Sequence, residues 1–426
     1  MLCRDRGDIM SNDIKFNQNK NKKKIYISIG LLIGIIIIFI YTSLNYFNKN
    51  YLYNGKIADN IFVHGIEISQ MSKKEAIDTI NKKYKPQNLN LSYKNDNYVI
   101  NFDDIELKYN TKELVEQAYN STRTGSYFND IISYISKKIE GEKYTIKSTY
   151  NKEKLDKSIE KIANDINQDA RDATVSIGRG INITPSKSGL KFEMKENKKL
   201  IEEALNDKKY ETIYLKVSVT KPRISTEDVS GINTNLASFS TTFNSALVER
   251  SYNIGLSARR CSNVILKPGE TFSYNEHTGM RVLSNGYLNA PVIVGNNYED
   301  APGGGVCQTS TTLFNAALLS GLEINQVRNH SKTSQYIPRG RDAMVNDGGS
   351  DLKFTNNFEH SVYIQCYRSG NSVVAAIYGS LQDKVGVNIR VDNFIYNGLP
   401  GAKTYRTITK NSKSKTSHIY TSVYKQ

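Results

Sequence analysis

One cysteine of this chain lies in a sequence context that suits a catalytic nucleophile. Cys307 stands in APGGGVCQTSTT, and a helical run over Thr311–Ser320 follows it and stops at Gly321. This order places the thiol at or near a helix N-terminus, where the helix dipole and unpaired N–H groups favour the thiolate. The glycines let a substrate backbone approach, and their N–H groups could hold an oxyanion. The alternative is a structural glycine turn around a buried thiol.

A thiolate nucleophile needs a general base, and His330 is the best-placed histidine. It follows the strand-like stretch that comes after the Cys307 helix, an order of elements also found in papain-like cysteine enzymes, which is an analogy of layout only. His277 is the weaker candidate because it lies in a polar loop. His360 precedes a predicted hairpin and is expected at the surface.

A carboxylate is expected to orient the imidazole of this base. Asp342, in RGRDA, is the first choice and Asp351 the second, although neighbouring arginines could equally bind the Asp342 carboxylate. Arg341 is a candidate to bind a substrate carboxylate. The residues expected to contact substrate are Gly304, Gly305, Gln308 and Arg341.

The other cysteines after residue 44 have ordinary structural explanations. Cys261 lies on the apolar face of a helix predicted over 244–262, and Cys366 alternates with apolar residues in a hairpin predicted over 361–378. Small buried thiols are common in protein cores. A disulfide between the two stays open, because spacing alone does not decide it. No Cys/His spacing is typical of zinc, so we expect neither a metal nor another cofactor.

An N-terminal helix is expected to anchor the chain in a membrane. Residues 25–44 carry no charge, and the basic stretch 20–24 precedes them. A helix of this length spans about 30 Å, one hydrocarbon core. The positive-inside tendency keeps the basic end in the cytoplasm and exports everything after residue 44. No Ala-x-Ala site follows, so the sequence predicts an uncleaved, single-pass signal anchor.

The charge of the chain bears on its partners. A formal net charge of +15 over 426 residues favours an anionic partner, such as an acidic wall polymer or an anionic membrane surface. Lysine is spread along the chain rather than gathered in one stripe, and export removes nucleic acid from reach. We therefore expect no nucleic-acid partner.

An internal repeat occupies the first half of the exported part. LKY at 107–109 with LVEQAYN at 114–120 resembles LKF at 190–192 with LIEEALN at 200–206. Each copy is typical of a strand, a turn and an amphipathic helix. The helices expected ahead of the two copies span 71–84 and 151–167.

These patterns predict an α+β fold with a single N-terminal transmembrane helix. Two small α+β repeat modules follow the anchor, and a mixed α+β domain follows the modules. The expected parts are a cytoplasmic tail (1–24), the anchor (25–44), a linker (45–54), modules at 55–135 and 136–228, a catalytic domain (229–382) and a peripheral C-terminal extension (383–426).

Several stretches of the predicted catalytic domain resemble the VanW family. The repeat modules resemble, more loosely, the peptidoglycan-binding modules that often precede VanW domains in Gram-positive surface proteins. Some clostridial members with both parts are regarded as L,D-transpeptidases. The matching stretches are LKPGETFSYN (266–275), APVI (290–293), GGGVCQTSTTLFN (303–315), NHS (329–331), GRDA (340–343) and DLKFTNN (351–357).

The resemblance implies a cell-wall enzyme whose partners are peptidoglycan stem peptides. In L,D-transpeptidation the Cys307 thiolate would attack the carbonyl of the third stem residue, and the thioester would pass to an amine of a neighbouring stem, giving a 3–3 cross-link. A carboxypeptidase or endopeptidase would use water instead. A non-catalytic wall-binding accessory protein of glycopeptide resistance is the alternative outside enzymes. The GVCQ context differs from the Ser-x-Gly-Cys motif of the better-known L,D-transpeptidase fold, so that fold is not implied.

Overall fold

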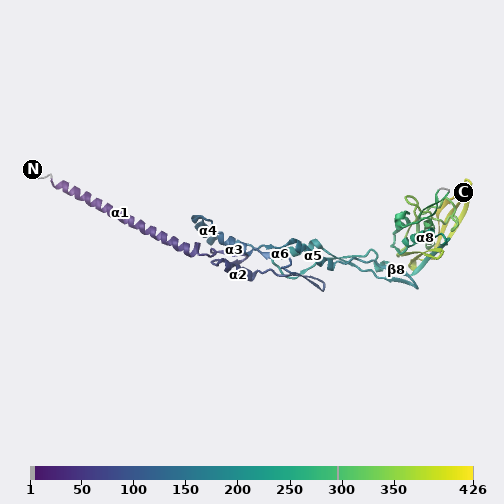
Figure 1. The fold of residues 1–426 in the computed structure, drawn as a ribbon, viewed down its shortest axis with the longest axis horizontal. Helices are drawn as coiled ribbons and strands as arrows, with labels where there is room; N and C mark the ends of the chain where they lie inside the picture. Colours follow the sequence, from purple (N-terminus) through teal and green to yellow (C-terminus); the bar gives the residue numbers. More distant parts are fainter. Residues whose placement is uncertain (1–4, 295–296, 426) are drawn as a thin grey trace. The chain divides into compact units, whose positions relative to one another are not determined.

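The computed structural model describes residues 5–294 and 297–425 and divides them into two compact units (Figure 1). Helices and strands alternate in both units, so the predicted α+β class is confirmed. Unit 1 contains the chain up to Ile166 and the segment Phe192–Ser218. Unit 2 contains Asn167–Lys191 and the chain from Val219 onward.

The helix α1 (Asp5–Phe47) contains the predicted apolar span and continues into a π-helical turn, η1 (Asn48–Leu52). Within the described residues, one helical stretch, Lys22–Leu52, is long and apolar enough to cross a membrane. None of its most apolar window is buried within the protein. A helix that exposes apolar side chains on all sides suits a lipid environment rather than water.

Unit 1 has two apolar cores, each built on helices. Ile80, Val115 and Tyr134 belong to the first core, and Leu155 and Ile201 to the second. The helices of the first core are α2 (Lys73–Lys83), α3 (Thr111–Asn120) and α4 (Tyr127–Glu140), and those of the second are α5 (Lys152–Ile166) and α6 (Met194–Asp207). The strands of unit 1 are β1 (Ile61–Val63), β2 (Ile66–Glu67), β3 (Leu89–Tyr93), β4 (Asp96–Ile100), β5 (Lys108–Tyr109), β6 (Glu142–Tyr144), β7 (Ser148–Thr149) and β11 (Ile213–Tyr214).

The predicted repeat is present as two strand–helix pairs, β5 with α3 and β10 (Gly189–Phe192) with α6. The helices predicted ahead of them are α2 and α5. The start of α2 shows why local sequence was sufficient here. Ser72 accepts a hydrogen bond from the Glu75 amide, and the Glu75 carboxylate accepts one from the Ser72 amide. This capping box satisfies two otherwise unpaired donors and fixes where the helix begins.

Each strand of the repeat is preceded by a hairpin, and each hairpin packs in a core formed mainly by residues that come later in the chain. The β3–β4 hairpin contributes Leu91 to the core of α5 and α6. The hairpin of β8 (Thr174–Ile177) and β9 (Ile181–Thr184) belongs to unit 2, where Val175 packs with Val229 and Tyr363. The cores therefore do not follow consecutive stretches of chain. The domain bounds given above stay predictions.

Unit 2 is built on an antiparallel sheet with the order β13-β21-β20-β14. The buried helix α10 (Val306–Ser320) contacts β13 and β21, and α8 (Val248–Arg260) contacts β20 and α10. The strands of this sheet are β13 (Thr234–Thr242), β14 (Val264–Leu266), β20 (Val362–Ser369) and β21 (Ser372–Gly379). The remaining elements are β12 (Val217–Thr220), α7 (Thr226–Ser230), β15 (Thr271–Ser273), α9 (Tyr274–Thr278), η2 (Leu283–Asn285), β16 (Asn289–Val294), β17 (Asn297–Pro302), β18 (Glu323–Gln326), β19 (Lys353–Thr355), η3 (Leu381–Asp383), β22 (Gly386–Tyr396), β23 (Leu399–Lys410) and β24 (Lys413–Val423).

Two expectations about unit 2 have clear outcomes. The predicted hairpin is β20–β21, and Cys261 and Cys366 are buried free thiols, so the disulfide that the sequence left open is not formed. The prediction that residues 383–426 are peripheral is wrong. Gly386–Val423 form a three-stranded sheet, β22-β23-β24, and Tyr420 of that sheet belongs to the main core. Charged and other polar side chains occupy most of its exposed positions, and that composition concealed the buried residues.

Asn253 fixes the segment ahead of α10 to α8. Its side-chain amide donates to the carbonyl oxygens of Leu288 (2.8 Å) and Gly304 (3.1 Å), and its side-chain oxygen accepts from the Leu288 amide (2.9 Å). Asn253 is fully buried, so no water replaces these bonds when they are lost.

We predict that Asn253→Ala lowers the stability of unit 2 by about 2–4 kcal/mol, because buried carbonyl groups lose their donors. Hydrogen exchange of the α10 amides in the full-length protein would measure this loss. Glu249→Gln is the matched control on the same helix, since Glu249 is exposed. Equal exchange in both variants would contradict the structural role of Asn253.

Candidate functional site

Cys307 lies in the first turn of α10, which begins at Val306 rather than at the predicted Thr311. The helix ends at Gly321 in a left-handed conformation, as expected. Gly305 precedes the helix with φ +102°, a conformation that side chains disfavour. The Cys307 amide donates to no carbonyl or side chain among the described residues. It is therefore free to donate to an oxyanion next to its own thiol.

The glycines of this turn are required partly by close packing. A Cβ on Gly305 would lie 2.9 Å from Cγ of Arg250, and a Cβ on Gly304 would lie 2.5 Å from the carbonyl oxygen of Ala290. Gly304 is buried against β16 and does not line the cavity described below. Gly304 and Gly305 are therefore required partly because α8 and β16 pack tightly against the turn, and not only for contact with a substrate.

Buried polar side chains of α10 hold the segment that carries Asp342. Ser310 donates to the carbonyl oxygen of Ala343 (2.5 Å), and Thr311 accepts from the Ala343 amide (3.0 Å). Asn315 donates to the carbonyl oxygen of Arg341 (2.8 Å). A buried helix this rich in polar groups is stable only when those groups are paired. The same helix therefore positions both Cys307 and the aspartate.

His330 joins the cysteine to the aspartate. Its Nδ1 lies 2.8 Å from Oδ2 of Asp342, and its backbone N–H donates to the same oxygen at 2.7 Å. The Cys307 thiol donates to the carbonyl oxygen of Val345 at 3.3 Å and also interacts with the His330 imidazole, which affects the pKa of both groups. Since Nδ1 is occupied by Asp342, Nε2 is the nitrogen left to face the sulfur. The structure thus brings the predicted residues Cys307, His330 and Asp342 together, with the imidazole between the thiol and the carboxylate.

Asp342 is held by tyrosines that the sequence did not point to. Tyr424 donates to Oδ1 of Asp342 at 2.6 Å, and Tyr420 donates to its carbonyl oxygen at 2.9 Å. Both tyrosines come from the C-terminal end of the chain, and Asp342 is 1% exposed. Only alternation of Tyr420, Ser422 and Tyr424 on one side of the chain could have indicated a buried face there.

The electrostatics of the site favour an ion pair between sulfur and imidazole. Burial raises the pKa of Cys307, but the hydrogen bond from His330 and the charge of its imidazole outweigh burial, so the pKa of the thiol is lowered. Burial lowers the pKa of His330, but its hydrogen bonds to Asp342 and Cys307 raise that pKa to about 10. The lowered pKa of the thiol and the raised pKa of the imidazole both favour a thiolate paired with an imidazolium.

The thiol and the imidazole line a cavity of about 920 Å³. The volume is in the range of substrate-binding pockets. Two arginines, Arg250 and Arg281, line it as well. Arg281 is committed to Asp347, with Nη1 2.7 Å from Oδ1. Arg250 is half-buried and makes no ion pair with any described residue; its Nη2 donates to Oε1 of Gln308 at 2.8 Å.

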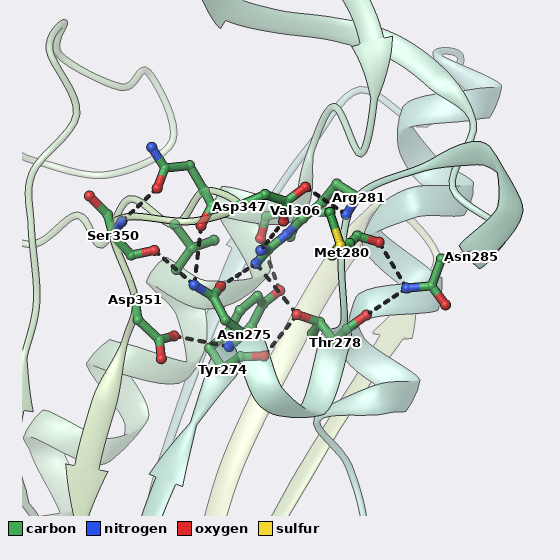
Figure 2. A network of polar contacts seen from close by, with 12 residues as sticks. Tyr274, Asn275, Thr278, Met280, Arg281, Asn285, Val306, Asp347, Ser350 and Asp351 are labelled. Carbon is green, nitrogen blue, oxygen red and sulfur yellow. Dashed lines mark hydrogen bonds and ion pairs between the residues drawn. The ribbon is translucent and has the colours of Figure 1, made fainter.

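A polar network fixes one wall of this cavity (Figure 2). The Arg281 guanidinium donates to Asn275 at 2.6 Å, and Asn275 donates to the carbonyl oxygen of Ser350 at 3.0 Å. Tyr274 donates to the carbonyl oxygen of Val306 at 3.1 Å, which ties the start of α10 to the same network. Figure 2 shows Arg281 between Tyr274 and Asp347.

Other predicted contact residues have structural partners. Gln308 lines the cavity, but its amide nitrogen donates to Thr241 and to the carbonyl oxygen of Thr242. Arg341 does not line the cavity; its Nε donates to Asn315 at 2.6 Å, and its guanidinium lies over the ring of Phe239. The guanidinium of Arg341 is therefore not placed to bind a substrate carboxylate in this cavity, the role that the sequence predicts for it.

The alternative histidines and the second aspartate lie elsewhere. His277 stacks on Phe272, and Asp351 is bound to Ser273 at 2.6 Å. His360 pairs with Asp383 at 3.0 Å. Over the described ranges, no group of three His, Cys, Asp or Glu side chains is arranged to hold a metal ion.

Comparison with known proteins gives two family matches along the chain. Residues 249–378 match the family described as "VanW like protein", and residues 98–213 match the family described as "Putative peptidoglycan binding domain". The uncharacterized protein YoaR of Bacillus subtilis is 39% identical over 191 residues, which are 43% of this chain and 63% of that protein. The vancomycin B-type resistance protein VanW of Enterococcus faecalis is 26% identical over 136 residues, 31% of this chain and 50% of that protein.

The matched part therefore spans between half and two thirds of each of these relatives. No solved structure matches the chain at a significant level. Cys307, His330 and Asp342 all lie within the segment that matches the first family. Tyr420 and Tyr424, which hold Asp342, lie after that segment. Residues 249–378 are thus similar to VanW-like proteins, and residues 98–213 are similar to a family described as peptidoglycan-binding.

Proposed function

We propose that the VanW-like domain is a cysteine L,D-transpeptidase that acts on the stem peptides of peptidoglycan. The observation that carries this proposal is the position of His330 between the Cys307 thiol and the Asp342 carboxylate, with the thiol and the imidazole lining a cavity of about 920 Å³. Nucleophile, base and orienting carboxylate in this order are the arrangement that acyl transfer requires. A thiol kept only for packing would need neither a lowered pKa nor an imidazole partner.

The proposed reaction has two acyl-transfer steps. The Cys307 thiolate attacks the carbonyl carbon of the third stem residue, a C–S bond forms, and the C–N bond to the terminal D-alanine breaks. The departing amine takes a proton from the His330 imidazolium. An amine of a second stem then attacks the thioester carbonyl and gives its proton to His330, and the thiolate leaves. The amide N–H of Cys307 donates to the carbonyl oxygen as negative charge develops on it.

Three observations support a cell-wall substrate and site of action. Residues 98–213 match a peptidoglycan-binding family. The α1 helix suits a single-pass anchor that leaves both units outside the cytoplasmic membrane. The Enterococcus faecalis relative is named for vancomycin resistance. We place the protein in the cell membrane, with its wall-directed part extracellular.

Cys307→Ala should abolish the formation of 3–3 cross-linked muropeptides by the full-length protein, with a loss of more than about 1,000-fold, because the nucleophile is removed. Mass spectrometry of the products formed from disaccharide-tetrapeptides would measure it. Cys366→Ala, which alters a buried core thiol, is the control and should retain activity.

Unchanged cross-linking by Cys307→Ala would refute the mechanism. Release of D-alanine without dimers, even with excess acceptor, would identify a carboxypeptidase in place of a transferase. No Cys307-dependent product of either kind would leave a non-catalytic wall-binding role.

The rate of alkylation of Cys307 should fall less steeply with decreasing pH than that of an ordinary thiol, because the pKa of Cys307 is lowered. We expect the rate with iodoacetamide to drop less between pH 8 and pH 6 than for an ordinary thiol with a pKa of about 8.5, which slows nearly tenfold per unit over that range. In His330→Ala, the strongest influence that lowers this pKa is lost, so the rate at pH 7 should fall about tenfold. Subtraction of the Cys307→Ala signal removes the background of other thiols; identical profiles with and without His330 would contradict the ion pair.

Arg250 is suited to bind the terminal carboxylate of the donor stem. Its side chain lines the same cavity as Cys307, and its stem packs over Gly305, two residues before Cys307. In the proposed reaction, a free carboxylate lies on the residue directly after the scissile bond. A half-buried arginine without an ion pair matches that charge.

Arg250→Gln should lower kcat/KM about 10- to 100-fold for a donor with a free terminal carboxylate, through loss of a charge-assisted hydrogen bond. The same donor with a C-terminal amide should be turned over equally slowly by both proteins. Arg259→Gln, an exposed arginine on the same helix, should leave both rates unchanged. An equal effect of Arg250→Gln on the acid and the amide would remove Arg250 from carboxylate recognition.

A further inference from the structure

Helix α4 of unit 1 carries an exposed apolar stripe that the proposed function does not use. Phe128 is 76% exposed, Ile132 65%, Ile135 48% and Ile139 76%. Their spacing of four, three and four residues places them along one face of the helix. An apolar face of this size in water is unfavourable, so it requires a covering partner.

The stripe is not simply the core-facing side of α4. Tyr134 and Asp130 of the same helix are buried, and Ile131 packs against the first core. Asp130 is satisfied there by Thr124 and by the hydroxyl of Tyr53. The helix thus has one face bound to unit 1 and a second apolar face left over.

The buried face of α4 contacts the outer end of the membrane-suited helix. The ring of Tyr134 lies 5.4 Å from that of Phe47, the last residue of α1, and the Tyr127 hydroxyl donates to Asn48 at 3.2 Å. The uncharged run ends at Leu44, and a helix rises about 1.5 Å per residue, so Phe47 is about 5 Å beyond it. In Figure 1 α4 lies beside this end of α1.

The surroundings of α4 resemble those of helices that lie flat in a membrane interface. Lys49 follows α1, and Lys137 and Lys138 stand in the last turn of α4. Lys137 pairs with Glu142 at 2.6 Å and Lys138 with Asp59 at 3.2 Å. Tyr46, near the end of α1, is 65% exposed. Aromatic residues and lysines gather at the depth of lipid headgroups, where lysines attract anionic lipids.

We propose that α4 lies in the outer interface of the same membrane that α1 crosses, with Phe128, Ile132, Ile135 and Ile139 inserted among the lipids. The partner is a phospholipid surface, favoured by anionic headgroups. This inference rests on the proposed membrane-spanning role of α1. It fixes the first core of unit 1 at the membrane surface, because α4 adds a second attachment beside the anchor.

The test uses full-length protein in vesicles of phosphatidylglycerol and phosphatidylcholine. An environment-sensitive NBD label is attached in turn to Ile132→Cys, Ile139→Cys and Lys82→Cys, in a Cys3→Ser and Cys307→Ala background. Lys82 is an exposed residue of α2 and serves as the matched control. An Ile36→Cys label within α1 reports the anchor itself.

We expect the labels at positions 132 and 139 to emit at shorter wavelength than the label at 82 and to be quenched by lipids with brominated acyl chains. Water-like emission at both α4 positions, with quenching at position 36, overturns the inference and leaves the anchor standing. A shift to shorter wavelength without quenching by brominated lipid assigns the stripe to a protein partner and also overturns it. Absence of quenching at position 36 refutes the anchor together with the inference.

Discussion

The buried carboxylate of Asp342 is the constraint on which the site depends. A carboxylate that is 1% exposed is costly to desolvate, by several kcal/mol, unless hydrogen bonds replace the lost water. Its donors are the backbone and ring of His330 and the hydroxyl of Tyr424. These groups come from segments far apart in the sequence. Satisfying one charge therefore orients the imidazole, docks the C-terminal sheet and, through the imidazole, lowers the pKa of Cys307.

The sequence pointed to the residues whose chemistry is visible locally. Glycines before a helical run marked Cys307, and the order of elements marked His330. Tyr420, Tyr424 and Arg250 were missed because nothing in their local sequence indicates a polar function. Arg341 was chosen for its place beside Asp342, but adjacent residues in an extended segment point in different directions, and its guanidinium packs over Phe239.

Besides the N-terminal span, local pattern predicted four helices of unit 1, α2, α3, α5 and α6, but not α4, most of the strands or the way these elements pack. The four helices follow from apolar spacing, and α2 also follows from its capping box. The β3–β4 hairpin is equally regular, yet its apolar face packs with helices that lie later in the chain. Hydrophobic periodicity predicts which face of an element is buried, but it does not predict which other element packs against that face. The C-terminal sheet was misjudged because its exposed face is unusually polar.

The packing of the β8–β9 hairpin has a mechanical consequence. The chain passes from unit 1 to unit 2 after Ile166, returns after Lys191 and passes again after Ser218. Three covalent segments therefore join the units in parallel, where most multidomain proteins rely on a single linker. A proteolytic cut in one segment leaves the units connected. A force applied across the two units would be divided among the three segments, so that no single segment bears all of it.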